Sequence, residues 1–132
     1  ELVLTDSGVL KVRHALTNQR AQPWQVDRFA VTLPVPERAG EVMAFHGRWI
    51  REFQPHRVAL SHDGFVLENR RGRTSHEHFP ALIAGTPGFH EQQGDVWGVH
   101  LGWSGNHRIK CEAKTDGRRL IQAEARNGAG RR

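Results

Sequence analysis

Hydrophobic and polar residues alternate along several short stretches of this chain, as they do in half-buried β-strands. Residues 9–16 place four side chains on one face, namely Leu10, Val12, His14 and Leu16. Residues 24–33 repeat the alternation, and we expect that strand to end before Pro34 and Pro36, whose rings remove two backbone donors. The first third of the chain is therefore predicted to be extended.

Residues 41–53 fit two patterns. A helical stripe would contain Val42, Phe45, Trp49, Ile50 and Phe53, whereas strict alternation would contain Met43, Phe45, Gly47 and Trp49. A glycine at the centre weakens a helix by about 1 kcal/mol relative to alanine. Because the neighbouring segments also alternate, we predict an extended segment here.

The remaining segments read as strands separated by turns. Residues 58–60 and 65–68 flank an Asp-Gly hairpin signal at 61–64, and residues 81–84 lead into a Gly-Thr-Pro-Gly turn. The clearest strand is 95–104, whose large apolar face consists of Trp97, Val99, Leu101 and Trp103. A last hairpin, 109–114 with 119–124, turns at Asp116-Gly117.

About eight short strands and no convincing helix predict an all-β protein, an antiparallel β-sandwich. A chain of 132 residues supports a single domain. We expect its core at about 9–124 and a flexible tail at 125–132. Because the chain starts at Glu1 instead of Met, we expect a fragment of a larger multidomain protein.

Composition narrows the classes of partner. The net charge is +5, and 16 of the 19 basic residues are Arg, the residue suited to planar recognition of carboxylates, phosphates and aromatic rings. The basic residues are dispersed among 14 acids, which argues against nucleic-acid binding. No apolar run is long enough to span a membrane. Cys111 is the single cysteine, which excludes an internal disulfide and favours a cytoplasmic location.

The densest run of polar groups is residues 68–76, Glu-Asn-Arg-Arg-Gly-Arg-Thr-Ser-His. It has neither helical nor strand periodicity, so we expect a loop with a binding or docking role. The alternative is a solvated surface, or a set of ion pairs that only rigidifies the loop.

A second patch is residues 47–52, Gly-Arg-Trp-Ile-Arg-Glu. Trp49, flanked by two guanidinium groups, would stack on a sugar ring or a base. The alternative is a core tryptophan covered by arginine stems.

Signals for catalysis or a cofactor are weak. His76-Glu77-His78 lacks the His-Glu-x-x-His spacing of helical zinc sites, and no residue marks Ser104 and His107 as a hydrolase pair. Glu52 and Glu68 adjoin arginines, which would lower their pKa and make them structural. We expect no catalytic residue, metal or cofactor in this chain.

Three stretches read together, 47–52, 68–76 and 97–107, resemble one family. They are similar to the N-terminal β-sandwich domain of bacterial α-galactosidases of glycoside hydrolase family 36, and the similarity extends over about residues 9–124. The resemblance implies a β-supersandwich preceding a catalytic (β/α)8 barrel that hydrolyses α-galactosides such as melibiose or raffinose with retention. The catalytic aspartates lie in the barrel, so this fragment alone is expected to be non-catalytic.

The resemblance also implies partners, namely the parent's own barrel and neighbouring subunits of a homo-oligomer, where this domain helps shape the substrate pocket. The candidate substrate or docking residues are Arg71, Arg73, Ser75, His76, Phe79 and Trp49. Phe79 departs from the family pattern, which has an amide there, so a hydrogen bond to a sugar is lost. A free-standing carbohydrate-binding module using Trp49, Trp103 or Phe79 is the alternative.

Overall fold

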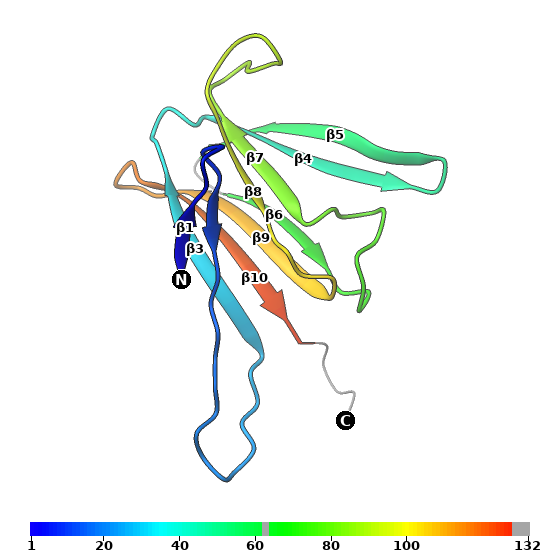
Figure 1. Ribbon diagram of the computed structural model, residues 1–132. Coiled ribbons are helices and arrows are strands. Elements are labelled where there is room, and N and C mark those ends of the chain that lie inside the picture. Colours follow the sequence, from blue (N-terminus) through cyan, green and yellow to red (C-terminus); the bar gives the residue numbers. More distant parts are fainter. Residues whose placement is uncertain (62–63, 128–132) are drawn as a thin grey trace.

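The computed structural model describes residues 1–61 and 64–127. Its strands in chain order are β1 (Leu2–Leu4), β2 (Leu10–Val12), β3 (Arg28–Val35), β4 (Glu41–Arg48), β5 (Arg51–Ala59), β6 (Phe65–Asn69), β7 (Ala81–Gly85), β8 (Val96–His100), β9 (Asn106–Ala113) and β10 (Arg119–Arg126). They form sheet I, ordered β3-β10-β9-β6, sheet II, ordered β5-β4-β7-β8, and a separate β1–β2 hairpin (Figure 1). The pairs are antiparallel, as predicted.

The core lies between the two four-stranded sheets. Every second residue of the inner strands is buried, which is the period of side chains that face one side of a sheet. Sheet II contributes Val42, Ala44, Leu82 and Ala84, and sheet I contributes Ile109, Cys111, Ile121 and Ala123. The prediction of an all-β sandwich is confirmed. Among the described residues, no helix has the length and apolar character needed to cross a bilayer.

Residues 41–53 are extended, as predicted, but they form two strands. β4 and β5 pair with each other, and the chain reverses at Trp49 and Ile50. The reversal needs Gly47, because a Cβ there would lie 2.7 Å from the Arg51 carbonyl oxygen. The pair projects at the right of Figure 1.

The prediction that Pro34 ends its strand is wrong. β3 runs from Arg28 to Val35 with Pro34 inside it, opposite Leu120 of β10. β3 is the edge strand of sheet I, so a proline that faces away from β10 removes no ladder bond.

Two further predicted boundaries are wrong. Within the predicted strand at 9–16, only Leu10–Val12 forms a strand. It pairs with β1, a three-residue strand that was not predicted, and therefore extends no further than β1 does. The 95–104 segment ends as a strand at His100.

The predicted tail also differs, because Arg126 belongs to β10 and the Asn127 N–H donates to the Asp27 carbonyl. The rest of the tail, 128–132, and part of the turn at 61–64 lie outside the described residues.

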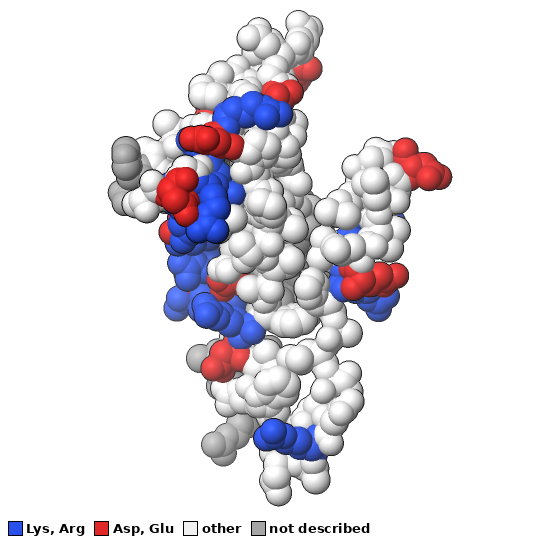
Figure 2. All heavy atoms as spheres, turned by 90° about the vertical axis from the view of Figure 1, so that its left-hand side faces the viewer, with Lys and Arg blue, Asp and Glu red and all other residues white. Residues whose placement is uncertain are grey.

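The outward face of sheet I is charged. Lys110 and Lys114 both pair with Glu112, and Arg126 pairs with Glu68. Figure 2 shows Lys and Arg beside Asp and Glu over this side of the molecule. A face of balanced charge is typical of a sheet surface that stays in water.

Candidate functional site

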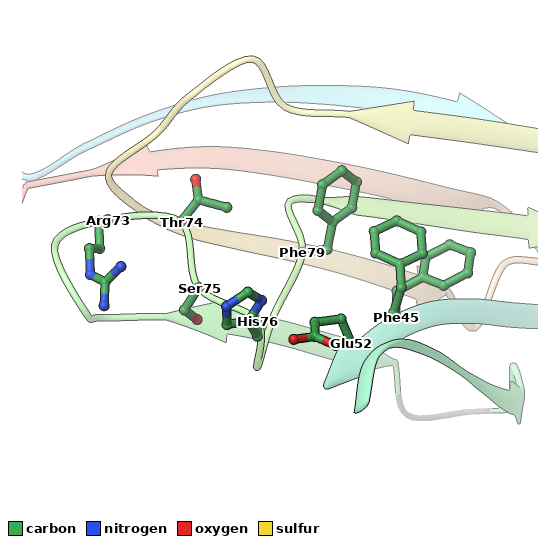
Figure 3. Close-up of a pocket in the computed structure, with 8 residues that line it drawn as sticks. Phe45, Glu52, Arg73, Thr74, Ser75, His76 and Phe79 are labelled. Carbon is green, nitrogen blue, oxygen red and sulfur yellow. The ribbon is translucent and has the colours of Figure 1, made fainter. Parts of the chain in front are cut away.

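A pocket of about 360 Å³ lies where the β4–β5 hairpin meets the loop after β6 (Figure 3). Its lining residues are Phe45, Glu52, Phe53, Arg73, Thr74, Ser75, His76 and Phe79. Four of the six candidates predicted from the sequence line it, namely Arg73, Ser75, His76 and Phe79. Phe45 and Phe53 were not predicted as site residues, and the β4–β5 reversal brings them beside the loop.

The pocket opens on the outer face of sheet II, which carries apolar side chains beside one ion pair, Arg57–Glu41. The register places Met43, Ile83 and Gly98 in one row across β4, β7 and β8, with Phe45 and Pro55 paired beside them. Val96, on the same face as Gly98, is 52% exposed. A Cβ at position 98 would meet only Ile83 Cγ1, at 4.0 Å, so another surface can approach the sheet closely at this glycine.

Aromatic rings form the floor of the pocket and continue it across the sheet. Phe45 and Phe53 stack with centroids 4.5 Å apart, and Phe79 meets Phe53 edge-on at 4.8 Å. Phe79 also stacks on His100 at 5.5 Å. The apolar ring at position 79 therefore joins a row of aromatic contacts instead of supplying a hydrogen bond.

The loop that carries the pocket's polar wall is held by a buried amide. Asn69, 1% exposed, accepts from the Arg71 N–H at 3.0 Å and donates to the Arg73 carbonyl at 2.8 Å. The Gly72 N–H donates to Asn106 Oδ1 at 2.6 Å, and the Thr74 N–H to the Ser104 carbonyl at 2.7 Å. These bonds tie the loop to the start of β9 and give it one shape.

The arginines of the loop have different roles. Arg71 makes a two-pronged contact with Glu77, at 3.0 and 2.6 Å, and Arg70 pairs with Glu68 at 3.0 Å. The ion-pair interpretation of the loop holds for these two, so Arg71 acts on the loop itself. Arg73 lines the pocket, and no ion pair of its side chain is found among the described residues.

Two further candidate residues, Ser75 and Trp49, lie at or beside the pocket. Ser75 Oγ is buried and has no hydrogen-bond partner within residues 1–61 and 64–127. Trp49 is 76% exposed at the hairpin tip, 6.4 Å from the His76 ring. The interpretation of Trp49 as a core residue is therefore wrong.

The hairpin tip is strained. Ile50 has φ 72° and Phe53 has φ 58°, in the left-handed region that costs a β-branched or bulky residue free energy. Ile50 is also 81% exposed, so no burial of its side chain offsets that cost. Strain of this kind concentrates where a partner or ligand is bound.

Both carboxylates singled out from the sequence have a lowered pKa. Backbone N–H groups, its own and that of Ile50 at 2.9 Å, lower the pKa of Glu52, with a smaller contribution from His76. Arg70 and then Arg126 lower the pKa of Glu68. The direction was predicted for both, but for Glu52 the cause is the backbone and not arginine. Neither group suits a general acid at neutral pH.

His76, Glu77 and His78 diverge. His76 lies at the pocket beside Glu52 (Figure 3), Glu77 pairs with Arg71, and His78 turns inward. His107 is buried with Nδ1 3.1 Å from the Gly105 carbonyl oxygen, and among the described residues no hydrogen bond joins it to Ser104. Across the described residues, no group of three potential ligands could hold a metal ion.

Comparison with known proteins identifies relatives over most of the chain. The family described as the glycosyl hydrolase family 36 N-terminal domain matches residues 2–126. An α-galactosidase of Escherichia coli is 81% identical over 125 residues, which are 95% of this chain and 18% of that protein. The bifunctional α-galactosidase/sucrose kinase AgaSK of Mediterraneibacter gnavus is 34% identical over 76 residues, 58% of this chain and 8% of that protein.

The solved structures that are similar to this chain include α-galactosidases as well. The family 36 α-galactosidase AgaA of Geobacillus stearothermophilus, in complex with raffinose, superposes with a TM-score of 0.66 at 26% identity, covering 73% of this chain and 13% of that one. The α-galactosidase of Lactobacillus brevis gives 0.64 at 26% identity, covering 70% and 12%. This chain thus spans less than a fifth of the length of the relatives it matches.

Proposed function

Because the chain belongs to the family of glycosyl hydrolase family 36 N-terminal domains, we propose that it is a non-catalytic accessory domain of an α-galactosidase. It packs on a catalytic barrel outside this chain and helps shape the galactoside site or the oligomer. The observation that carries the proposal is the contrast between the two sheets. Sheet I presents several charge pairs, whereas sheet II presents Met43, Ile83 and Val96 beside an aromatic pocket and a single ion pair, Arg57–Glu41.

The apolar outer face of sheet II is the docking face in this proposal. Covering it would remove half-exposed aliphatic and aromatic side chains from water, at about 25 cal/mol per Å² of apolar area. The exposed Trp49 and Ile50 at the hairpin tip extend beyond that face and would enter the partner's surface. A strained tip whose Trp49 and Ile50 side chains are exposed is consistent with this use.

The pocket supplies the polar contacts to the galactoside site. Arg73 offers a guanidinium fork, Ser75 a hydroxyl, and His76 an imidazole beside Trp49. Hydroxyl groups of a sugar accept and donate to such groups, while aromatic rings stack on the sugar face. Arg71 contributes indirectly, by holding Glu77 and the loop.

A solved relative supports the proposed substrate class. AgaA was solved with raffinose, which supports a terminal α-galactoside of the raffinose or melibiose type. The parent is proposed to be a homo-oligomer in which the hairpin tip reaches a neighbouring subunit. In that arrangement the site would be complete only after assembly.

The test of this proposal uses the chain alone. We expect the purified chain to leave an aryl α-galactoside uncleaved, and its tryptophan fluorescence to stay constant during titration with raffinose, because its pocket is one wall of a larger site. Hydrolysis by the chain would overturn the accessory role. Saturable binding of raffinose would instead support an independent carbohydrate-binding module.

A further inference from the structure

The outer strands of the two sheets differ in how their free edges are protected. A proline or a charged side chain on an edge strand hinders another strand from pairing with it. β3 contains Pro34, β5 contains Pro55 and β6 contains Glu68. β8 has the sequence Val-Trp-Gly-Val-His, and of the four outer strands of sheets I and II in the described residues it alone has neither proline nor Asp, Glu, Lys or Arg.

The register with β7 decides which backbone groups of β8 are free. The Leu101 N–H, just beyond the strand, donates to the Pro80 carbonyl at 2.8 Å. Because ladder bonds in an antiparallel pair recur at every second residue, Val99 and Trp97 are bonded to β7. The N–H and C=O groups that point away from the sheet therefore belong to Val96, Gly98 and His100. No backbone hydrogen bond to them is found within residues 1–61 and 64–127.

The core is incompletely covered along the same strand. Trp97 and Val99 face inward and pack against the core, yet both are only half-buried. The inward residues of the neighbouring β7, Leu82 and Ala84, are 0% exposed. On the outer face, Gly98 leaves room that a bulky side chain of an adjacent strand can fill. A strand paired with β8 would thus satisfy the free backbone groups and cover the open side of the core.

We propose that a strand of the polypeptide that follows this chain pairs with the free edge of β8 and extends sheet II. The proposal rests on the proposed function, in which the chain is one part of a longer α-galactosidase. Its E. coli relative supports a long continuation, because the matching residues are 18% of that protein. The added strand should be apolar where its side chains lie beside Trp97 and Val99, and bulky opposite Gly98.

The path of the chain gives the direction of the added strand. β10 ends at Arg126, which pairs with Asn106, and residues 101–105 connect Asn106 to His100 at the end of β8. β8 and β10 therefore end on the same side of the molecule (Figure 1). A segment that continues from β10 would reach the free edge at His100 first and run toward Val96, antiparallel to β8.

A second copy of the chain is the poorer occupant of this edge. Two β8 strands paired with each other would contribute only five residues from each copy, whereas a specific interface between proteins buries about 1,000 Å² or more. A strand of the same polypeptide needs no such area, because the connection keeps its effective concentration high.

The test compares amide hydrogen exchange at 96–100 in the isolated chain and in the E. coli α-galactosidase whose matching segment is replaced by residues 2–126. In the isolated chain, Trp97 and Val99 should exchange slowly and Val96, Gly98 and His100 fast. In the chimera these three amides should exchange about a hundredfold more slowly, since each gains a partner. Equal exchange at these three amides in the chain and the chimera would overturn the proposal.

A proline variant separates strand pairing from mere coverage. Gly98→Pro removes an N–H that points off the edge and breaks no bond to β7. Its control is Ala30→Pro, four residues before Pro34 on the free edge of β3. In the chimera, Gly98→Pro should return Val96 and His100 to the fast exchange of the isolated chain, whereas Ala30→Pro should leave both slow. Slow exchange that persists in Gly98→Pro would indicate a covering surface instead of a paired strand and overturn the proposal.

The comparison without substitutions stands even if Gly98→Pro fails to fold. The mass of the isolated chain in solution tests the other occupant: we expect a monomer, and a dimer that Gly98→Pro dissociates would assign the edge to a second copy and overturn the proposal. These readouts are independent of activity. A chimera that cleaves raffinose while 96–100 exchanges fast would refute the added strand and leave the accessory role intact.

Discussion

At the scale of single residues, the loop owes its shape to one amide more than to its arginines. Asn69 was hidden in a charged run, and the sequence did not indicate that the β6 register turns it into the core beside His107. Arg70 and Arg71, which are prominent in the sequence, form ion pairs with Glu68 and Glu77. The run of charged residues in the sequence thus predicted where the loop lies. Which of its residues hold the loop in shape depends on strand register, which the sequence does not show.

Changing Asn69 to Ala should destabilise the chain. It removes both hydrogen bonds of a side chain that is 1% exposed and leaves the Arg71 N–H and the Arg73 carbonyl without that partner. We expect the free energy of unfolding to fall by about 2 kcal/mol in urea melts.

Asn18 provides the matched control. It makes the same pair of contacts, with the Arg20 N–H at 2.9 Å and the Gln22 carbonyl at 2.8 Å, but on an exposed turn. Asn18→Ala should cost less than about 0.5 kcal/mol. Equal losses in the two variants would show that burial of Asn69 is not what stabilises the loop.

At the scale of elements, the β4–β5 hairpin shows what periodicity can and cannot predict. Alternation and Gly47 correctly indicated an extended segment, but both strands continue the same pattern, so nothing marked the reversal at Trp49 and Ile50. No Asn-Gly or Asp-Gly pair stands at this turn, and a left-handed isoleucine occupies it instead. The hidden reversal is also why Phe53 was not predicted as a pocket residue.

Ile50→Gly should stabilise the isolated chain by about 1 kcal/mol, because glycine adopts a positive φ without strain and the isoleucine side chain is 81% exposed. Urea unfolding measures this change. If the tip enters a partner, the same substitution should lower kcat/KM in a complete enzyme.

Val96→Gly is the control for that variant. Val96 is an exposed strand residue without positive φ, so glycine there should destabilise the chain by about 1 kcal/mol through backbone entropy alone. A loss of stability in Ile50→Gly as large as that in Val96→Gly would contradict the strain assigned to the tip.

At the scale of the whole molecule, the two sheets differ in what their outer faces present. The fold class and the alternation of 95–104 were predictable, because the burial of alternate residues leaves a direct trace in the sequence. Which outer face is apolar was not predictable, since it requires the order β5-β4-β7-β8 and the pairing of distant strands. This difference between the outer faces supports a docking role for sheet II.

The most direct test replaces the matching segment of the E. coli α-galactosidase with residues 2–126 of this chain and measures kcat/KM on raffinose. The account predicts an active chimera, a loss of activity when the domain is deleted, and an increase in KM of about tenfold for Arg73→Ala, the size of one lost charge-assisted hydrogen bond. The control Arg118→Ala, at the β9–β10 turn and paired with Asp116, should leave KM unchanged. Full activity without the domain, or equal KM values for all three chimeras, would contradict the account.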